Sequence, residues 1–266
     1  MKKIAIVLSE GGMSCAYSVG VVLGLVDKYK LIDPDIVIGA SGSSGIAAYF
    51  VAKQFEEGQR IWENLLSTEK FISLSRLSKI IDIDYVIDEM FKKQEPLNVE
   101  AIRQSKTKLL ITATNLTKGD TEYFSNQDDI FEVLRASNAI VLLYGKKIRI
   151  KNNDYIDGAI STSFADNINK AKELGATKII AIDNTNKWPT ANLFLRLYKL
   201  FHPNLKKLNL SSKFTPDDSI FLFKPSKSLS VMGTLDNNQQ RLRETIKIGY
   251  DDVMNSKVFE EFLENY

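Results

Sequence analysis

The chain has 266 residues, and its 35 Lys and Arg residues against 33 Asp and Glu residues give a formal net charge of +2. This length suits one large α/β domain or two small ones, and the balanced charge gives no reason to expect nucleic acid as a partner. A single Cys excludes an internal disulfide, and one Cys with one His does not supply the ligands of a usual zinc site. We therefore expect neither a metal nor another cofactor.

Hydropathy bears on the location of the protein. The N-terminal apolar run, residues 4–8, is too short for the core of a signal peptide, and no run approaches the roughly 18 apolar residues of a membrane span. We expect a soluble, cytoplasmic protein. The apolar segment Asn192 to Phe201 carries Arg196 and Lys199. It fits either a core helix with solvated basic residues or a helix that docks peripherally on an anionic membrane surface.

The first fifty residues alternate between two kinds of predicted element. Lys3 to Leu8 is apolar without alternation, which is typical of a fully buried strand. A glycine-containing turn leads to a helix over Ala16 to Tyr29, in which Gly20 and Gly24 lie one turn apart and favour close packing. The strand Ile36 to Ile38 and a second helix follow. This β-α-β-α order predicts parallel strands with right-handed crossovers.

The remainder predicts more strands and helices of the same sheet. Glu56 to Lys93 is predicted to be helical, and within it Phe71 to Ile81 fits either a surface helix or a cover over a site. Further strands are expected at Leu109–Thr114, Glu122–Phe124, Lys147–Ile150, Asp154–Ile156, Lys178–Ile182 and Ile220–Phe223, and further helices at Asp128–Ala136, Ala165–Leu174 and Gln239–Met254. We expect a single domain over 1–266, whose core, 3–183, is completed by 184–266.

The corner after the second strand is the first candidate site. Gly39-Ala40-Ser41-Gly42-Ser43 joins a buried strand to an apolar helix, which is the layout of a serine nucleophile elbow. The N-terminal amides of that helix would face an oxyanion formed on Ser41. An ordinary capped helix after a buried strand is the alternative interpretation.

A serine nucleophile requires a base, and the sequence leaves two possibilities. The only histidine is His202, and Ser41, Asp157 and His202 follow the chain order of an α/β-hydrolase triad. Nothing in the sequence around His202 supports that role. The second possibility is a dyad in which Asp157 takes the serine proton directly, which requires a partly dry site and strong oxyanion stabilisation.

Taken together, these motifs resemble the patatin-like phospholipase family. Leu8 to Tyr17 is similar to the family's glycine-rich oxyanion loop, Gly39 to Ser43 to its Gly-x-Ser-x-Gly elbow, and Asp157-Gly158-Ala159 to its Asp-Gly-Gly/Ala motif. The segments Ile111 to Leu116 and Arg135 to Ile140 are similar to intervening family segments. The ordered set, from about Lys3 to Ile182, is more specific than any one motif.

The resemblance implies a three-layer α/β/α fold with a mostly parallel central sheet. It also implies a lipid acyl hydrolase, that is, a phospholipase A-type esterase without metal that forms an acyl-enzyme. Ser41 would be the nucleophile and Asp157 the base. The oxyanion donors would be the N–H groups of Gly11, Gly12, Met13 and Gly42. The expected partner is a lipid or ester substrate, with transient contact to a membrane surface.

The sequence departs from the family pattern at four positions. Glu10 replaces the first glycine of the loop and places a carboxylate beside the expected oxyanion. Ser14 replaces the basic residue of the loop, and Cys15 and Ser43 replace glycines. These departures predict reduced activity or an altered substrate. They also leave a second hypothesis, a lipid-binding or regulatory protein that has lost catalysis.

Overall fold

A mixed β-sheet forms the centre of the computed structural model, which describes residues 3–76, 79–184, 198–208 and 214–264. Within these residues the sheet has eight strands in the order β5-β6-β3-β2-β1-β7-β8, and β4 pairs with β3. The strands are β1 (Ile4–Leu8), β2 (Ile36–Ala40), β3 (Lys108–Asn115), β4 (Asp120–Ser125), β5 (Ile148–Ile150), β6 (Asn153–Asp157), β7 (Lys178–Ile182) and β8 (Ile220–Phe223). The pairs β1–β2, β2–β3, β1–β7 and β7–β8 are parallel, whereas β4, β5 and β6 join antiparallel pairs.

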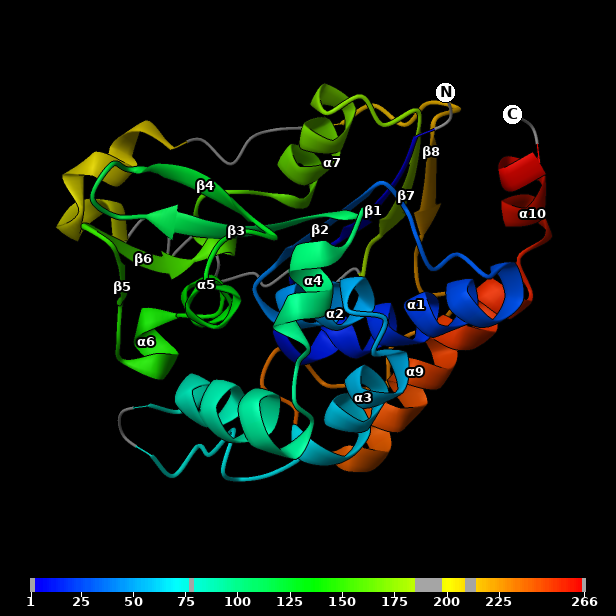
Figure 1. Ribbon diagram of the computed structural model, residues 1–266. Coiled ribbons are helices and arrows are strands. Elements are labelled where there is room, and N and C mark those ends of the chain that lie inside the picture. The colour runs from blue at the N-terminus through cyan, green and yellow to red at the C-terminus, as the bar shows by residue number, and fades with distance from the viewer. Residues whose placement is uncertain (1–2, 77–78, 185–197, 209–213, 265–266) are drawn as a thin grey trace.

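Helices cover both faces of the sheet, so the α/β/α layering is confirmed (Figure 1). The helix α7 (Phe164–Glu173) packs Ile168 and Ala171 on one face, against a cluster that includes Val7 and Ile38. The larger core lies on the other face. The helices described there and at the edges are α1 (Ala16–Tyr29), α2 (Gly42–Val51), α3 (Phe55–Arg60), α4 (Val99–Gln104), α5 (Ile130–Ser137), α6 (Val141–Tyr144), α9 (Gln239–Met254) and α10 (Lys257–Glu264).

The two longest described helices, α1 and α9, cross at glycines. A Cβ atom on Gly20 would lie 1.8 Å from the Ile246 carbonyl oxygen, and one on Gly249 would lie 2.2 Å from the Tyr17 carbonyl oxygen. Only residues without a side chain permit backbones to approach this closely. The expectation that Gly20 serves close packing is therefore confirmed. The α1–α9 crossing and the β7–β8 pairing join the C-terminal part of the chain to the core. Both contacts support a single domain over 1–266, which stays a prediction.

The predicted continuous helix over Glu56 to Lys93 is wrong. Helical structure covers α3, the π-helical segment η2 (Ile61–Leu65) and the π-helical segment η3 (Tyr85–Gln94). The described residues between them are mainly turns and loops, with an isolated antiparallel bridge between Ile72 and Ile81. Ile81 N–H donates to the Leu143 carbonyl oxygen at 3.0 Å, so contacts distant in the sequence fix this conformation.

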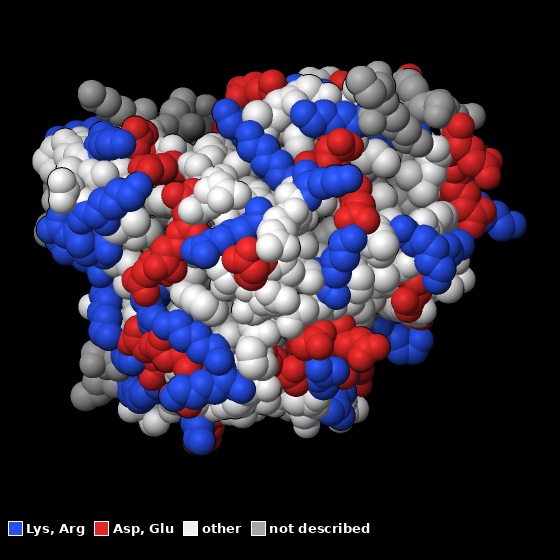
Figure 2. Space-filling model, viewed as in Figure 1, with Lys and Arg blue, Asp and Glu red and all other residues white. Residues whose placement is uncertain are grey.

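The surface carries charges of both signs. Figure 2 shows Lys and Arg side chains interspersed with Asp and Glu over one face of the molecule, in keeping with the small net charge. Within the described ranges, none of the helices combines the length and the apolar composition that crossing a membrane requires. Most of the apolar segment Asn192 to Phe201, interpreted above as a core or membrane-docking helix, lies outside the described residues.

The α1–α9 crossing predicts the effect of adding one methyl group. Gly249→Ala should lower the free energy of unfolding by about 2 kcal/mol or more, because the new Cβ meets backbone that must shift. Urea denaturation measures the change. Gly58→Ala in α3 is the control, since its Cβ would first meet the Tyr49 side chain at 3.3 Å. It should change stability by less than about 1 kcal/mol. Equal effects of the two substitutions would contradict the close crossing.

Candidate active site

Ser41 lies at a strained corner between β2 and α2. Its backbone angles, φ 51° and ψ −132°, fall where residues with a side chain are rarely found. Neighbouring hydrogen bonds hold this conformation: Ser44 N–H and Ser44 Oγ donate to the Ser41 carbonyl oxygen at 2.9 and 2.7 Å, and Ser41 N–H donates to Ser137 Oγ at 3.0 Å. Gly39 is required here because a Cβ would lie 2.9 Å from the Ser43 carbonyl oxygen. The corner has the geometry of a nucleophile elbow.

Asp157 ends β6, and the following glycine permits the strand to end there. A Cβ on Gly158 would lie 2.4 Å from the Thr112 carbonyl oxygen, so the chain passes β3 at backbone contact. Asp157 N–H donates to the Ala139 carbonyl oxygen at 3.1 Å, and Thr114 Oγ1 donates to the Asp157 carbonyl oxygen at 2.7 Å. These bonds fix the backbone that carries the carboxylate.

The strands β2 and β6 lie on either side of β3. The register of the sheet places Ser41, which follows β2, near Asp157, which ends β6. Ala40 at the end of β2 is in register with Thr112, and Ala113, the next residue of β3, is in register with Asp157. Although β6 is antiparallel to β3, its last residue therefore lies level with the last residue of β2. The Ser41 and Asp157 side chains span the remaining distance.

A direct hydrogen bond joins the two side chains. Ser41 Oγ donates to Asp157 Oδ2 at 2.6 Å, and Asp157 Oδ1 accepts from Ala159 N–H at 2.8 Å. Asp157 is buried, with 1% of its surface exposed. Its pKa is raised to about 7: burial is the main cause, the hydrogen bonds from Ser41 and Ala159 act in the opposite direction, and the charge of Glu10 adds to the rise. A carboxylate with this pKa is a better base near neutral pH than an ordinary aspartate.

The glycine loop after β1 lies against this corner. A Cβ on Gly42 would be 2.8 Å from the Gly12 carbonyl oxygen, which shows how closely the loop and the elbow approach. Gly12 and Gly42 both line the cavity that contains Ser41. Within the described residues, the N–H groups of Gly11, Gly12 and Gly42 donate to no other protein group. The last two are therefore available to a ligand oxygen at Ser41.

The N–H groups of Gly11 and Met13, the other two expected oxyanion donors, are placed differently from those of Gly12 and Gly42. Met13 N–H donates to the Thr234 carbonyl oxygen at 3.1 Å. Gly11 does not line the cavity, and a Cβ on it would lie 2.8 Å from the Asn184 side chain. Asn184 and Thr234 thus support the loop from one side each. Sequence reasoning missed both, because neither belongs to a motif and their contacts exist only in the folded chain.

Glu10 introduces a buried acid beside the loop. The residue as a whole is partly exposed, but its Oε2 atom is buried and accepts no hydrogen bond from the described residues. The pKa of Glu10 is raised to about 7. Burial is the main cause, its own backbone N–H acts in the opposite direction, and the charges of Asp183 and Asp166 add to the rise. Glu10 is thus largely neutral below pH 7, and its negative charge opposes an oxyanion mainly above that pH.

The other departures from the family pattern fit without an evident clash. Ser43 is buried, and its Oγ donates to the Ala40 carbonyl oxygen at 2.9 Å, so it reinforces the corner. Ser14 and Cys15 are buried too, and burial raises the pKa of the Cys15 thiol. A neutral, inaccessible thiol does not act as a nucleophile, so Cys15 is not an alternative to Ser41.

His202 is not among the groups that contact Ser41 or Asp157. It caps the short 3-10 helix η5 (Pro203–Lys207) and stacks on Tyr198 with ring centroids 6.0 Å apart. Both carboxylate oxygens of Asp157 are occupied by Ser41 and Ala159. The hydrogen bonds of the described residues therefore place no imidazole between Ser41 and Asp157. In the same ranges, no group of three or more His, Cys, Asp or Glu side chains could hold a metal ion.

A largely apolar cavity opens at Ser41. Phe71, Ile72 and Ile81 line it, so described parts of the segment interpreted above as a surface helix or a cover border this cavity. Asn138 contributes a polar group to the wall, and its Nδ2 donates to Ser44 Oγ at 2.9 Å. The remaining lining residues are Met13, Gly45, Trp62, Leu66, Ile83, Val86, Ile87, Phe91, Ile140, Thr234 and Leu235.

Comparison with known proteins agrees with the motifs. The model of the family described as patatin-like phospholipase matches residues 6–168, which is more than half of the chain and contains both Ser41 and Asp157. The chain belongs to the patatin-like phospholipase family. No curated protein matches the sequence significantly.

Solved structures show the patatin-like fold as well. Among the matching chains is VipD from Legionella pneumophila, with a TM-score of 0.56 and 14% sequence identity. The alignment covers 99% of this chain and 67% of the VipD chain. At this identity the match shows the fold alone. The family membership supports a lipid hydrolase at the level of the family.

The raised pKa of Asp157 predicts a pH dependence of stability. Between its ordinary pKa of 3.8 and about 7, the folded protein holds a proton that the unfolded chain has released. Raising the pH through this window therefore lowers the free energy of unfolding. Asp157→Asn should reduce the loss between pH 5 and pH 8 by on the order of 2 kcal/mol, measured by urea denaturation at both pH values. An unchanged loss would show that Asp157 is not a buried acid with a raised pKa.

Proposed function

We propose that the protein hydrolyses carboxylic esters of lipids through an acyl-enzyme, with Ser41 as nucleophile and Asp157 as base. The observation that supports this most directly is the 2.6 Å hydrogen bond from Ser41 Oγ to buried Asp157 Oδ2. A base must lie within hydrogen-bond reach of the proton that it removes, and this one does. The apolar cavity at Ser41 suits an acyl chain.

In the first half of the reaction, Ser41 Oγ attacks the ester carbonyl carbon as its proton passes to Asp157 Oδ2. The carbonyl oxygen becomes an oxyanion, which accepts hydrogen bonds from the N–H groups of Gly12 and Gly42. The positive end of α2 adds to this stabilisation, because the helix begins at Gly42. Collapse breaks the bond to the alcohol, which leaves with the proton from Asp157, and the acyl group remains on Ser41.

In the second half, water replaces the alcohol. Asp157 removes a proton from water, the resulting attack regenerates the oxyanion, and the fatty acid leaves as Ser41 Oγ recovers its proton. The same carboxylate is thus first base and then acid in each half, which a pKa of about 7 favours. Gly11 and Met13 assist only through the shape of the loop while Met13 N–H remains bonded to Thr234. The cytoplasmic location and a transient contact with membranes remain predictions.

Glu10 gives a specific reason to consider a second function. Its buried Oε2 atom has no hydrogen-bond partner among the described residues, and the residue begins the proposed oxyanion loop. A protein with this charge could bind lipid without turning it over. In that case vesicles would retain the protein while no ester is hydrolysed in a Ser41-dependent manner.

Removing either proposed catalytic group should abolish hydrolysis. Ser41→Ala and Asp157→Asn should each lower kcat for p-nitrophenyl octanoate on the order of 10³-fold or more, because proton transfer and attack act as a unit. Release of p-nitrophenol measures the rate. His202→Ala is the control and should retain full activity. Unchanged turnover in Ser41→Ala would refute the proposal, and loss in His202→Ala would favour a triad.

The pH profile tests the base and its neighbour. We expect kcat/KM to rise with pH through about 7, because Asp157 must lose its proton before it can accept one from Ser41. Glu10→Gln should move this rise to lower pH, since the charge of Glu10 raises the pKa of Asp157. It should also increase kcat/KM at pH 8 by roughly tenfold, because it removes a charge that opposes the oxyanion.

A charge-matched control for Glu10→Gln is Glu56→Gln, which removes an exposed carboxylate in α3. Its pH profile should coincide with that of the unmodified protein. If Glu10→Gln also leaves both the rise and the rate unchanged, Glu10 does not act on the site. The replacement of the family's usual loop residues by Glu10 and Ser14 would then need another explanation.

A further inference from the structure

A short stretch at the end of α5 holds both members of the proposed dyad. Ser137 Oγ accepts a hydrogen bond from Ser41 N–H at 3.0 Å, and the Ala139 carbonyl oxygen accepts one from Asp157 N–H at 3.1 Å. Ser137 and Ala139 are fully buried. The residue between them, Asn138, lines the cavity at Ser41. Its backbone therefore has a fixed place relative to both Ser41 and Asp157.

Two hydrogen bonds fix which way the amide of Asn138 faces. Its Nδ2 donates to the Leu134 carbonyl oxygen at 2.8 Å and to Ser44 Oγ at 2.9 Å. A carbonyl oxygen cannot donate, so the group that faces Leu134 must be the NH2 of the amide. The Ser44 hydroxyl already donates to the Ser41 carbonyl oxygen, so it too accepts from Asn138. These contacts rule out the flipped orientation of the amide.

The amide oxygen, Asn138 Oδ1, is the end of the side chain that can still bind. No N–H or O–H group of the described residues donates to it, and it is not a fully buried atom. Among the described residues that line this cavity, only Ser41, Asn138 and Thr234 carry a hydroxyl or a carboxamide. An acceptor held rigidly in a largely apolar cavity is typical of a contact that selects a ligand.

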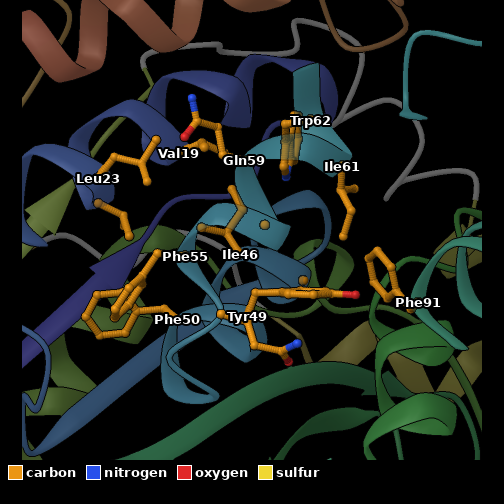
Figure 3. Close-up of a pocket in the computed structure, with 14 residues that line it drawn as sticks. Val19, Leu23, Ile46, Tyr49, Phe50, Phe55, Gln59, Ile61, Trp62 and Phe91 are labelled. Carbon is orange, nitrogen blue, oxygen red and sulfur yellow. The ribbon is translucent and has the colours of Figure 1, made fainter. Parts of the chain in front are cut away.

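The opposite side of α2 is packed with apolar side chains. Figure 3 shows Ile46, Tyr49 and Phe50 of this helix among side chains that come mainly from α1, α3 and η2. Burying a hydroxyl among such groups costs free energy unless the hydroxyl finds a hydrogen-bond partner. A substrate hydroxyl near Ser41 is therefore better placed beside Asn138 than on this side of the helix.

We propose that Asn138 is a specificity residue, whose Oδ1 accepts a hydrogen bond from a hydroxyl that is vicinal to the ester in the alcohol part of the substrate. The alcohol leaves with the proton from Asp157, whose backbone is held by Ala139, so the alcohol is the part of the ester that meets this stretch. The substrate class is then the monoacyl esters of polyols, a conclusion that rests on the proposed function. A diacyl ester lacks this hydroxyl and would leave Oδ1 unpaired.

Two pairs of esters test the contact. 1-Octanoylglycerol and 1-octanoyl lysophosphatidylcholine both carry the vicinal hydroxyl, and each is compared with its 2-O-methyl analogue, which cannot donate. Release of octanoate gives kcat/KM, and the ratio within a pair cancels changes in overall activity. We expect the hydroxyl to be favoured roughly tenfold in at least one pair, which identifies the alcohol. Ratios near one in both pairs would overturn the proposal.

A substitution with a matched control shows whether Asn138 causes the preference. Asn138→Leu removes the acceptor at similar volume and should lower the ratio roughly fivefold or more. Asn255 ends α9 as Asn138 ends α5, and its Nδ2 likewise donates to the carbonyl oxygen four residues earlier, at 2.8 Å, but it does not line the cavity. Asn255→Leu should leave the ratio unchanged. If Asn138→Leu leaves it unchanged, the analogue's methyl group merely clashes and the proposal is wrong.

Binding to an inactive protein separates this proposal from the proposed function. In Ser41→Ala, isothermal titration calorimetry should give a Kd for the preferred hydroxyl ester roughly tenfold below that of its 2-O-methyl analogue, and adding Asn138→Leu should remove the difference. Equal Kd values in Ser41→Ala would overturn the contact even where hydrolysis depends on Ser41. If no hydrolysis depends on Ser41, the proposed function fails, and these Kd values still decide whether Asn138 binds the hydroxyl.

Discussion

The site depends on one hydrogen bond in a dry environment, from Ser41 Oγ to Asp157 Oδ2. In water, a carboxylate is too weak a base to take a proton from an alcohol. Burial changes this balance because it penalises the charged carboxylate, and the bond to Ser41 then partly replaces the lost hydration. The strained corner, the register of β3 and the backbone contact at Gly158 all serve to hold these two oxygens together. A change in any of them would separate the pair without touching either side chain.

The glycine loop and the cavity add the other parts that ester hydrolysis needs. Gly12 and Gly42 offer N–H groups beside Ser41, and a largely apolar cavity opens there. Glu10 works against this arrangement when it is charged, although its raised pKa reduces that effect below pH 7. The chain therefore combines the geometry of the proposed Ser41–Asp157 dyad with a proposed oxyanion loop whose charge is unlike that of its family.

Much of the fold could be predicted from the sequence where local patterns suffice. The helix α1 and the strands β7 and β8 have the predicted bounds, because buried strands and amphipathic helices leave regular hydropathy patterns. Residues 66–76 and 79–82 did not follow their helical pattern, since bonds to Leu143 and to Asn237 override local preference there. The pairing of Ser41 with Asp157 was implied by the resemblance to the family, and their hydrogen bond agrees with it. The supporting contacts of Thr234 and Asn184 left no signal in the sequence.

Mass spectrometry after treatment with a fluorophosphonate tests the central claim most directly, because this reagent modifies only a serine hydroxyl whose proton is being withdrawn. The account predicts rapid labelling at Ser41, at least a hundredfold slower labelling of Ser41 in Asp157→Asn, and none at that position in Ser41→Ala. Equal labelling rates with and without the Asp157 carboxylate would contradict the account, as would a protein in which Ser41 remains unmodified.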